Sequence, residues 1–207
     1  DAGVVERATV FIAFEGVTLQ PGDEDATTNT SQFFDAPQTM QPYKAADPNR
    51  AAKIATVTDE IRAILAPYNL EIVTTRPTEG RYDMIVLGGS ATDVGLTTNE
   101  IDGIAAIDCP DARKSGIVLL FGDAPGPIRV PKVAASLSVV ALGITNGIPT
   151  STVDDDCMCW GGGGCSHLGR CSVGGANTNV TPNHQCAGGA TTMDEHERFV
   201  AAFGLAP

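Results

Sequence analysis

The stretch AASLSVVALGITNG, residues 134–147, contains no charged side chain, and its apolar residues surround a whole helix rather than one stripe. This pattern predicts a helix from about Pro131 to Leu142, ended by Gly143. A helix that is apolar nearly all round is buried on every side. We therefore place it at the centre of the domain, with the rest of the fold arranged around it.

The segments before this helix alternate between strand and helix patterns. Apolar residues at Ile54, Val57, Ile61 and Ile64 have helical spacing, and this helix should start at Asp47 or Asn49 and end before Pro67. Stretches rich in β-branched and apolar residues predict four strands, at 8–19, 70–77, 82–89 and 116–123. The fold class expected is α/β (α+β), with a twisted mixed sheet, a long N-terminal helix and a central helix.

The composition changes after Thr150. Residues 154–186 are dominated by glycine, asparagine and cysteine, with little apolar periodicity, so covalent crosslinks must hold this part. A final amphipathic helix follows within 191–205, capped by Thr192 or Asp194, with Phe199, Val200 and Phe203 buried. We expect an α/β core at 1–150 and a stapled region at 151–207 whose helix packs back on that core.

The six cysteines predict disulfide bonds. Their number is even, and 15 pairings remain open from the sequence. A zinc cluster is the alternative, but the spacings do not match the paired Cys-x-x-Cys of common structural zinc sites. Disulfides indicate a secreted, extracellular or cell-surface protein. The cysteines are Cys109, Cys157, Cys159, Cys165, Cys171 and Cys186.

The net charge of the chain limits the kinds of molecule that it is expected to bind. The formal net charge is −12, so the chain repels phosphate backbones and anionic lipid surfaces. No signal peptide or long apolar span is visible, which suggests a leader that was removed or not included. We expect a protein partner, either another copy or an extracellular protein, and neither nucleic acid binding nor membrane insertion.

The order of these segments resembles the metzincin clan of secreted zinc peptidases, in the matrixin-like bacterial style. The stretches VFIAFEGVTL (10–19), YNLEIVTTRP (68–77), RYDMIVLGG (81–89) and GIAAIDCPD (103–111) look like the front half of that family. The resemblance covers roughly residues 8–160. It places residues 134–147 where the family carries His-Glu-x-x-His-x-x-Gly-x-x-His, with Gly143 as the motif glycine and Met158 as the methionine of the turn beneath the metal.

The residues needed for catalysis are absent from this motif. Counted from Gly143, the three ligand positions hold Ser136, Val140 and Asn146, and the glutamate position holds Leu137. Such enzymes need zinc to acidify a water and a carboxylate to take its proton. Valine and leucine can do neither, and serine and asparagine are poor zinc ligands. The resemblance therefore implies a pseudo-metallopeptidase without catalytic residues, although an enzyme is not excluded by the sequence.

Two other groups could bind a metal. A relocated zinc site would use His167, His184 and His196, although their long spacings fit no familiar motif. The acidic run Asp154, Asp155 and Asp156 could bind calcium, although an exposed acidic turn is the simpler interpretation. Apart from this calcium, no cofactor is expected.

The function expected from the sequence is that of a secreted, catalytically inactive metzincin-like protein. It would act through its surface, as an extracellular binding protein or as a structural component that assembles with itself, including into filaments. The alternative is an active zinc metallopeptidase or hydrolase with a relocated metal site in the histidine- and cysteine-rich C-terminal region.

Overall fold

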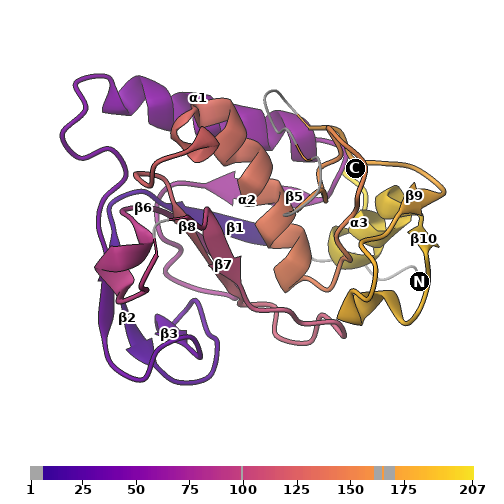
Figure 1. Cartoon of the computed structure of the whole chain (residues 1–207), viewed down its shortest axis with the longest axis horizontal. Coiled ribbons are helices and arrows are strands. Elements are labelled where there is room, and N and C mark those ends of the chain that lie inside the picture. Colours follow the sequence, from indigo (N-terminus) through magenta and orange to yellow (C-terminus); the bar gives the residue numbers. More distant parts are fainter. Residues whose placement is uncertain (1–6, 99, 161–164, 166–170) are drawn as a thin grey trace.

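The computed structural model describes residues 7–98, 100–160, 165 and 171–207, and has a mixed α+β fold (Figure 1). The α-helices are α1 (Arg50–Leu65), α2 (Pro131–Thr145) and α3 (Glu195–Phe203). The strands are β1 (Ala8–Ala13), β2 (Val17–Pro21), β3 (Thr30–Ser31), β4 (Gln38–Met40), β5 (Leu70–Val73), β6 (Asp83–Gly88), β7 (Gly103–Ala105), β8 (Ile117–Phe121), β9 (Thr178–Asn179) and β10 (Thr192–Met193). Short 3-10 turns are η1 (Ala91–Val94), η2 (Pro127–Arg129) and η3 (Gln185–Ala187).

The central sheet has five strands in the order β5-β1-β6-β8-β7. Its first four strands are parallel, and β7 pairs antiparallel with β8 at the edge. Strands β6 and β8 are buried along their whole length, as expected for parallel strands covered on both faces. The sheet is therefore mixed, as the sequence predicts.

Two hydrophobic cores cover the two faces of this sheet. Because side chains alternate along a strand, Ile85 and Leu87 of β6 enter one core while Met84 and Val86 enter the other. The first core also contains α1, α2 and α3. The second lies beneath the small sheet β3-β2-β4 and η1. In Figure 1, α1 and α2 lie side by side on the helical face, and β2 and β3 project from the opposite side.

Helix α2 is buried as expected, but it ends at Thr145, three residues after the predicted Leu142. Every residue from Val133 to Thr145 is buried, and the helix continues through Gly143. The N–H of Ile148 bonds to the carbonyl of Gly143, and that of Gly147 bonds to Ile144. With Gly147 at φ +74°, these two bonds form a Schellman ending. Gly147 is therefore the capping glycine, and the assignment to Gly143 was wrong.

The strand expected at 8–19 is interrupted. Gly16 has φ +78°, which divides the stretch into β1 and β2, and β2 leaves the central sheet to pair with β4. A Cβ at Gly16 would lie 2.5 Å from the carbonyl oxygen of Met40, so only glycine fits where these segments meet. The sequence pattern continues through this turn, because residues on both sides of it are apolar and buried.

The C-terminal part packs on the helical core. Met158, Val180, Phe199 and Phe203 belong to the same hydrophobic cluster as α2, whereas Val200 is only partly buried. Asp194 rather than Thr192 caps α3, because its carboxylate accepts a hydrogen bond from the N–H of Glu197. None of the helices in the described ranges is both long enough and apolar enough to cross a membrane.

The six cysteines form three disulfides, which resolves the pairing that the sequence left open. Cys109 pairs with Cys186, Cys157 with Cys171, and Cys159 with Cys165. The first bond joins the loop after β7 to η3, over a sequence separation of 77 residues. The other two close short loops beside Met158. Three disulfides are compatible with an oxidising compartment.

We predict that Gly147→Ala destabilises the fold by about 2 kcal/mol or more. A Cβ there would lie 2.6 Å from the carbonyl oxygen of Asp108 and 2.7 Å from that of Cys109, in addition to the cost of the positive φ. Gly80→Ala is the matched control, since Gly80 also has a positive φ of +78° but a Cβ built there would meet no atom within 4 Å. This substitution should cost only about 1 kcal/mol. Equal losses in urea unfolding would contradict this account.

Candidate functional site

The four residues of α2 and its C-terminal end that the resemblance aligns with zinc ligands and a catalytic glutamate face the interior of the protein. Ser136 and Val140 are completely buried, Leu137 is 5 % exposed, and Asn146 is 5 % exposed. These four side chains are therefore surrounded by protein. A peptide substrate could reach none of them without a rearrangement of the segments that cover α2.

A backbone segment closes over Ser136. Its hydroxyl oxygen accepts a hydrogen bond of 3.3 Å from the N–H of Cys171, and Cys171 is held by its disulfide to Cys157. Both half-cystines are buried in the core that contains α2. Ser138, two residues further along the helix, donates to the carbonyl of Ala134 at 2.7 Å. Neither serine has the exposed position on a strained turn that a nucleophile requires.

Asn146 holds the end of α2 to the sheet. Its Nδ2 donates to Asp83 Oδ2 and to the carbonyl of Leu142, at 2.9 Å each. Asp83 Oδ1 accepts the N–H of Gly116 at 2.7 Å, so β6, the residue before β8 and the residue after α2 meet at this carboxyl group. Burial raises the pKa of Asp83, and the hydrogen bonds from Asn146 and Gly116 oppose this increase. The amide at the third ligand position thus has a structural partner.

Gly143 is needed for contact with Met158. A Cβ built on Gly143 would lie 2.4 Å from Met158 Sδ and 2.8 Å from its Cε, and Met158 is completely buried. Met158 follows the helix in the sequence and packs against α2 at this position, and the helix continues past the glycine to Thr145.

The histidines proposed for a relocated zinc site have separate partners. His184 Nδ1 accepts the N–H of Cys186 at 3.2 Å at the start of η3, and burial lowers its pKa. His196 Nδ1 lies 3.0 Å from the hydroxyl of Tyr68, with the rings in tilted contact. His167 lies outside the described residues. Within the described ranges, no three His, Cys, Asp or Glu side chains form a group suited to a metal.

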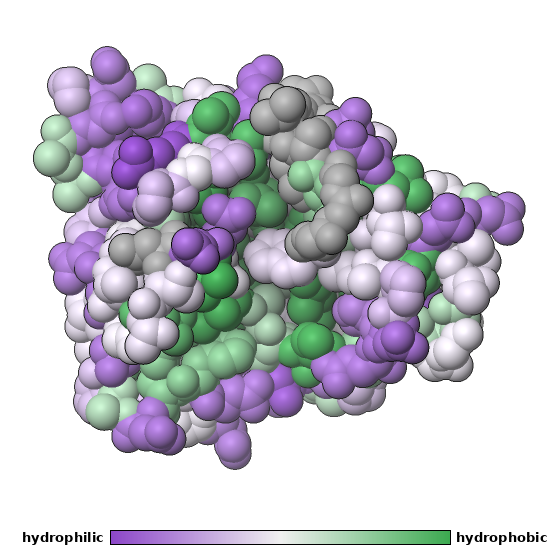
Figure 2. All heavy atoms as spheres, in the orientation of Figure 1, coloured by the Kyte–Doolittle hydropathy of each residue, from purple (hydrophilic) through white to green (hydrophobic). Residues whose placement is uncertain are grey.

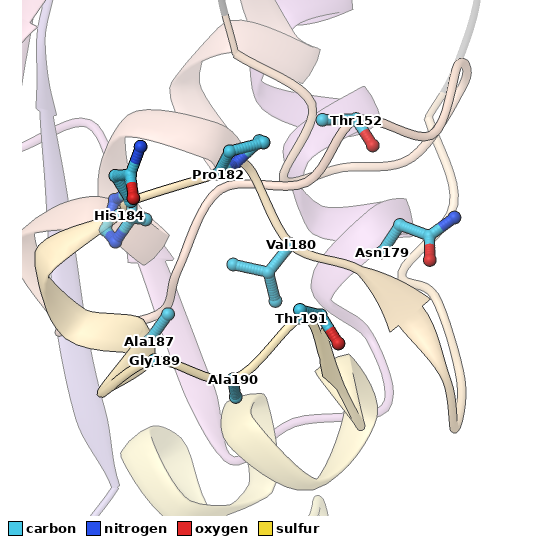
Figure 3. Close-up of a pocket in the computed structure, with 10 residues that line it drawn as sticks. Thr152, Asn179, Val180, Pro182, His184, Ala187, Gly189, Ala190 and Thr191 are labelled. Atoms are coloured by element: carbon cyan, nitrogen blue, oxygen red, sulfur yellow. The ribbon is translucent and has the colours of Figure 1, made fainter.

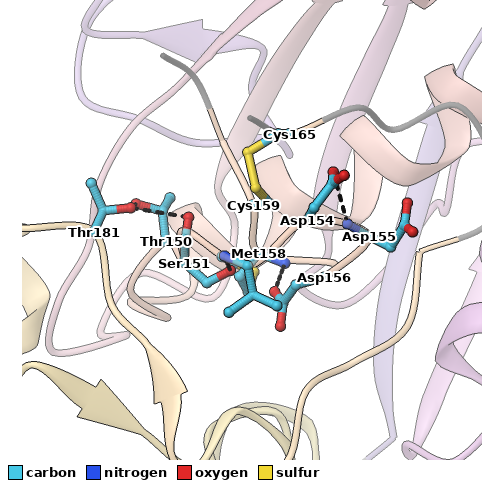
Figure 4. Close-up of a disulfide and its surroundings, with 10 residues drawn as sticks. Thr150, Ser151, Asp154, Asp155, Asp156, Met158, Cys159, Cys165 and Thr181 are labelled. Atoms are coloured by element: carbon cyan, nitrogen blue, oxygen red, sulfur yellow. Dashed lines mark hydrogen bonds between the residues drawn. A yellow bond between two sulfur atoms is a disulfide. The ribbon is translucent and has the colours of Figure 1, made fainter. Parts of the chain in front are cut away.

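The acidic run divides into two environments. Asp154 and Asp155 are exposed, whereas Asp156 is 4 % exposed and its Oδ1 accepts the N–H of Met158 at 2.6 Å. Figure 4 shows the Asp156 carboxylate turned away from Asp154 and Asp155. The three carboxylates therefore do not converge as ligands of one ion, and the exposed acidic turn expected from the sequence accounts for only the first two.

Glu195 is a buried carboxyl group that sequence reasoning missed. It is completely buried at the start of α3, near Asp156. Burial, followed by the neighbouring Asp156, raises its pKa to about 10. Nothing in the sequence signals this environment, because a glutamate in the first turn of a helix is ordinarily a solvated residue that favours the helix dipole.

A separate recess of about 430 Å³ lies between residues 179–191 and Thr152 (Figure 3). Asn179, Val180, Pro182 and His184 line one part of it, and Figure 3 places Val180 near the middle of the surrounding chain. The recess offers apolar and amide surface with one imidazole, which suits the capture of a side chain or short peptide better than chemistry on a bound substrate.

We predict that Gly143→Ala destabilises the protein. In an ordinary helix interior this change stabilises by about 0.5–1 kcal/mol, but here the new methyl group overlaps the enclosed Met158 side chain. The sign should therefore reverse, with a loss of about 1–3 kcal/mol in denaturant unfolding. Combining Gly143→Ala with Met158→Ala should cost less than the two single losses added together. Strict additivity would show that the contact does not set the residue at 143.

Comparison with known proteins gives no match to this chain, either among protein-family models or among curated proteins and solved structures. Its function must therefore be inferred from the chemistry of its own residues.

Proposed function

We propose that this chain is a secreted, catalytically inactive metzincin-like protein that acts through its surface, as an extracellular binding protein or as a subunit of an assembly. The mixed sheet and the central helix support the proposed relationship, because their order agrees with the resemblance stated above. The three disulfides support secretion, because such bonds persist mainly in oxidising compartments.

The observation that carries the proposal is the enclosure of the motif positions. The two polar side chains, Ser136 and Asn146, are engaged with Cys171 and with Asp83. The other two positions, Leu137 and Val140, have no atom that could bind zinc or accept a proton. A site for metal-assisted hydrolysis needs an open coordination position and access for a substrate. Neither requirement is met around these four residues.

The surface offers features suited to binding a protein. Figure 2 shows apolar residues gathered across the middle of the face seen in Figure 1, between hydrophilic margins. Val130, Val153 and Leu205 are large apolar residues with 51 %, 39 % and 57 % of their surface exposed. The recess beside Val180 provides a concave site as well. Apolar area and a recess favour a protein partner, and the net charge of −12 disfavours an anionic one.

The first test is a measurement of zinc content and peptidase activity. Purified protein should bind no zinc tightly, and it should cleave neither casein nor a mixed peptide library, with or without added zinc. A chelator should change nothing. Cleavage that a chelator abolishes would contradict the proposal. In that case, alanine substitutions at His167, His184 and His196 would decide whether a relocated site is responsible, since activity retained in all three would dismiss that alternative.

The second test separates a binding protein from a subunit of an assembly. Sedimentation velocity over a wide concentration range should show reversible or filamentous association if the chain assembles with itself. A monomer at all concentrations would leave a different extracellular protein as the partner. The variants Val130→Ser and Leu205→Ser, each at an exposed apolar position, should weaken association if these side chains contribute to the contact.

A further inference from the structure

Three oxygen atoms from three separate segments converge beside Gly174. A Cβ built on Gly174 would lie 2.4 Å from Thr178 Oγ1, 2.6 Å from Asp156 Oδ2 and 2.9 Å from Glu195 Oε2. Thr178 belongs to β9, Asp156 precedes Met158, and Glu195 begins α3. The glycine leaves open the space that these oxygens surround, because any side chain at 174 would fill it.

The two carboxyl groups in this space are buried without a counter-charge. Glu195 is completely buried and Asp156 is 4 % exposed, and neither forms an ion pair within the described part of the chain. Neither oxygen of Glu195 has a hydrogen bond of normal geometry, although the Asp156 carboxyl and the Gly174 backbone lie close enough to act on the pKa of Glu195. Isolated buried carboxylates are very costly, so this arrangement requires either a proton or a cation between the two groups.

The surrounding oxygen atoms favour calcium as that cation. Calcium takes six to eight oxygen ligands at about 2.3–2.6 Å from carboxylates, backbone carbonyls and water. The carbonyl oxygen of Gly175 accepts the Thr178 hydroxyl at 2.8 Å, so a carbonyl lies next to the three converging oxygens. Zinc is a poor fit here, since it is usually bound through nitrogen or sulfur.

We propose that Asp156, Glu195 and Thr178 form a calcium site that ties α3 to the turn at Met158. Of the three carboxylates in the acidic run, only that of Asp156 belongs to this site, and Asp154 and Asp155 do not. Bound calcium would fix the first turn of α3 and residues 174–178 against the segment that carries the Cys157–Cys171 disulfide. This role is structural and does not depend on whether the chain has a catalytic or a binding function.

The test is thermal unfolding of the full chain, with its disulfides intact, in calcium or in a chelator. About 10 mM CaCl₂ should raise the midpoint by about 5 °C over EDTA, and the same concentration of MgCl₂ should not. Isothermal titration with calcium alone should give one ion per chain. No shift and no binding heat in the wild-type protein would overturn the proposal and leave a shared proton as the explanation.

Two variants locate the effect. Glu195→Gln should abolish the calcium shift and leave the midpoint in EDTA no lower, because an amide can donate to Asp156. Asp154→Asn removes an exposed carboxylate of the same run and should retain the full shift. A shift that survives Glu195→Gln would overturn the proposal. If that variant does not fold, Asp156→Asn serves instead, because its Oδ1 can still accept the N–H of Met158, and the same outcomes apply.

Discussion

The burial of α2 on every side is the constraint that the rest of the structure satisfies. A buried polar group without a partner costs about 1–3 kcal/mol, so each polar side chain on this helix must find one inside the protein. Ser138 bonds to its own helix, Ser136 accepts from Cys171, and Asn146 donates to Asp83. These bonds connect the helix to the sheet on one side and to the cysteine-rich region on the other.

The cysteine-rich region depends on the helix in turn. Residues 171–193 have few buried apolar side chains, and they are held by disulfides and by contacts with α2. Met158 occupies the space at Gly143, and Cys171 covers Ser136. A covalent crosslink and a methionine therefore stabilise the part of the chain that packs against the middle of α2.

The sequence predicts the elements whose pattern is local and misses the features set by distant residues. The buried strands β6 and β8, the helix α1 and the burial of α2 follow from hydrophobic periodicity. The end of α2 was misplaced because two nearby glycines serve different purposes. Gly143 makes room for Met158, while Gly147 supplies the positive φ, and sequence spacing cannot distinguish these roles. The short strand β7 also lacks a recognisable pattern, with only three residues.

The two candidate sites also differ in whether the sequence alone could predict them. The absence of zinc ligands on α2 is visible in the sequence, since it concerns residue types at fixed spacing. The meeting of Asp156 with Glu195 is not, because it joins positions nearly forty residues apart through a fold held by disulfides. Histidines placed at Ser136, Val140 and Asn146 would not by themselves create a metal site, because the imidazole rings would need space that is filled by protein. Opening that space would remove the contacts that hold the C-terminal region against α2. A metal site on this helix would therefore lower the stability of the fold.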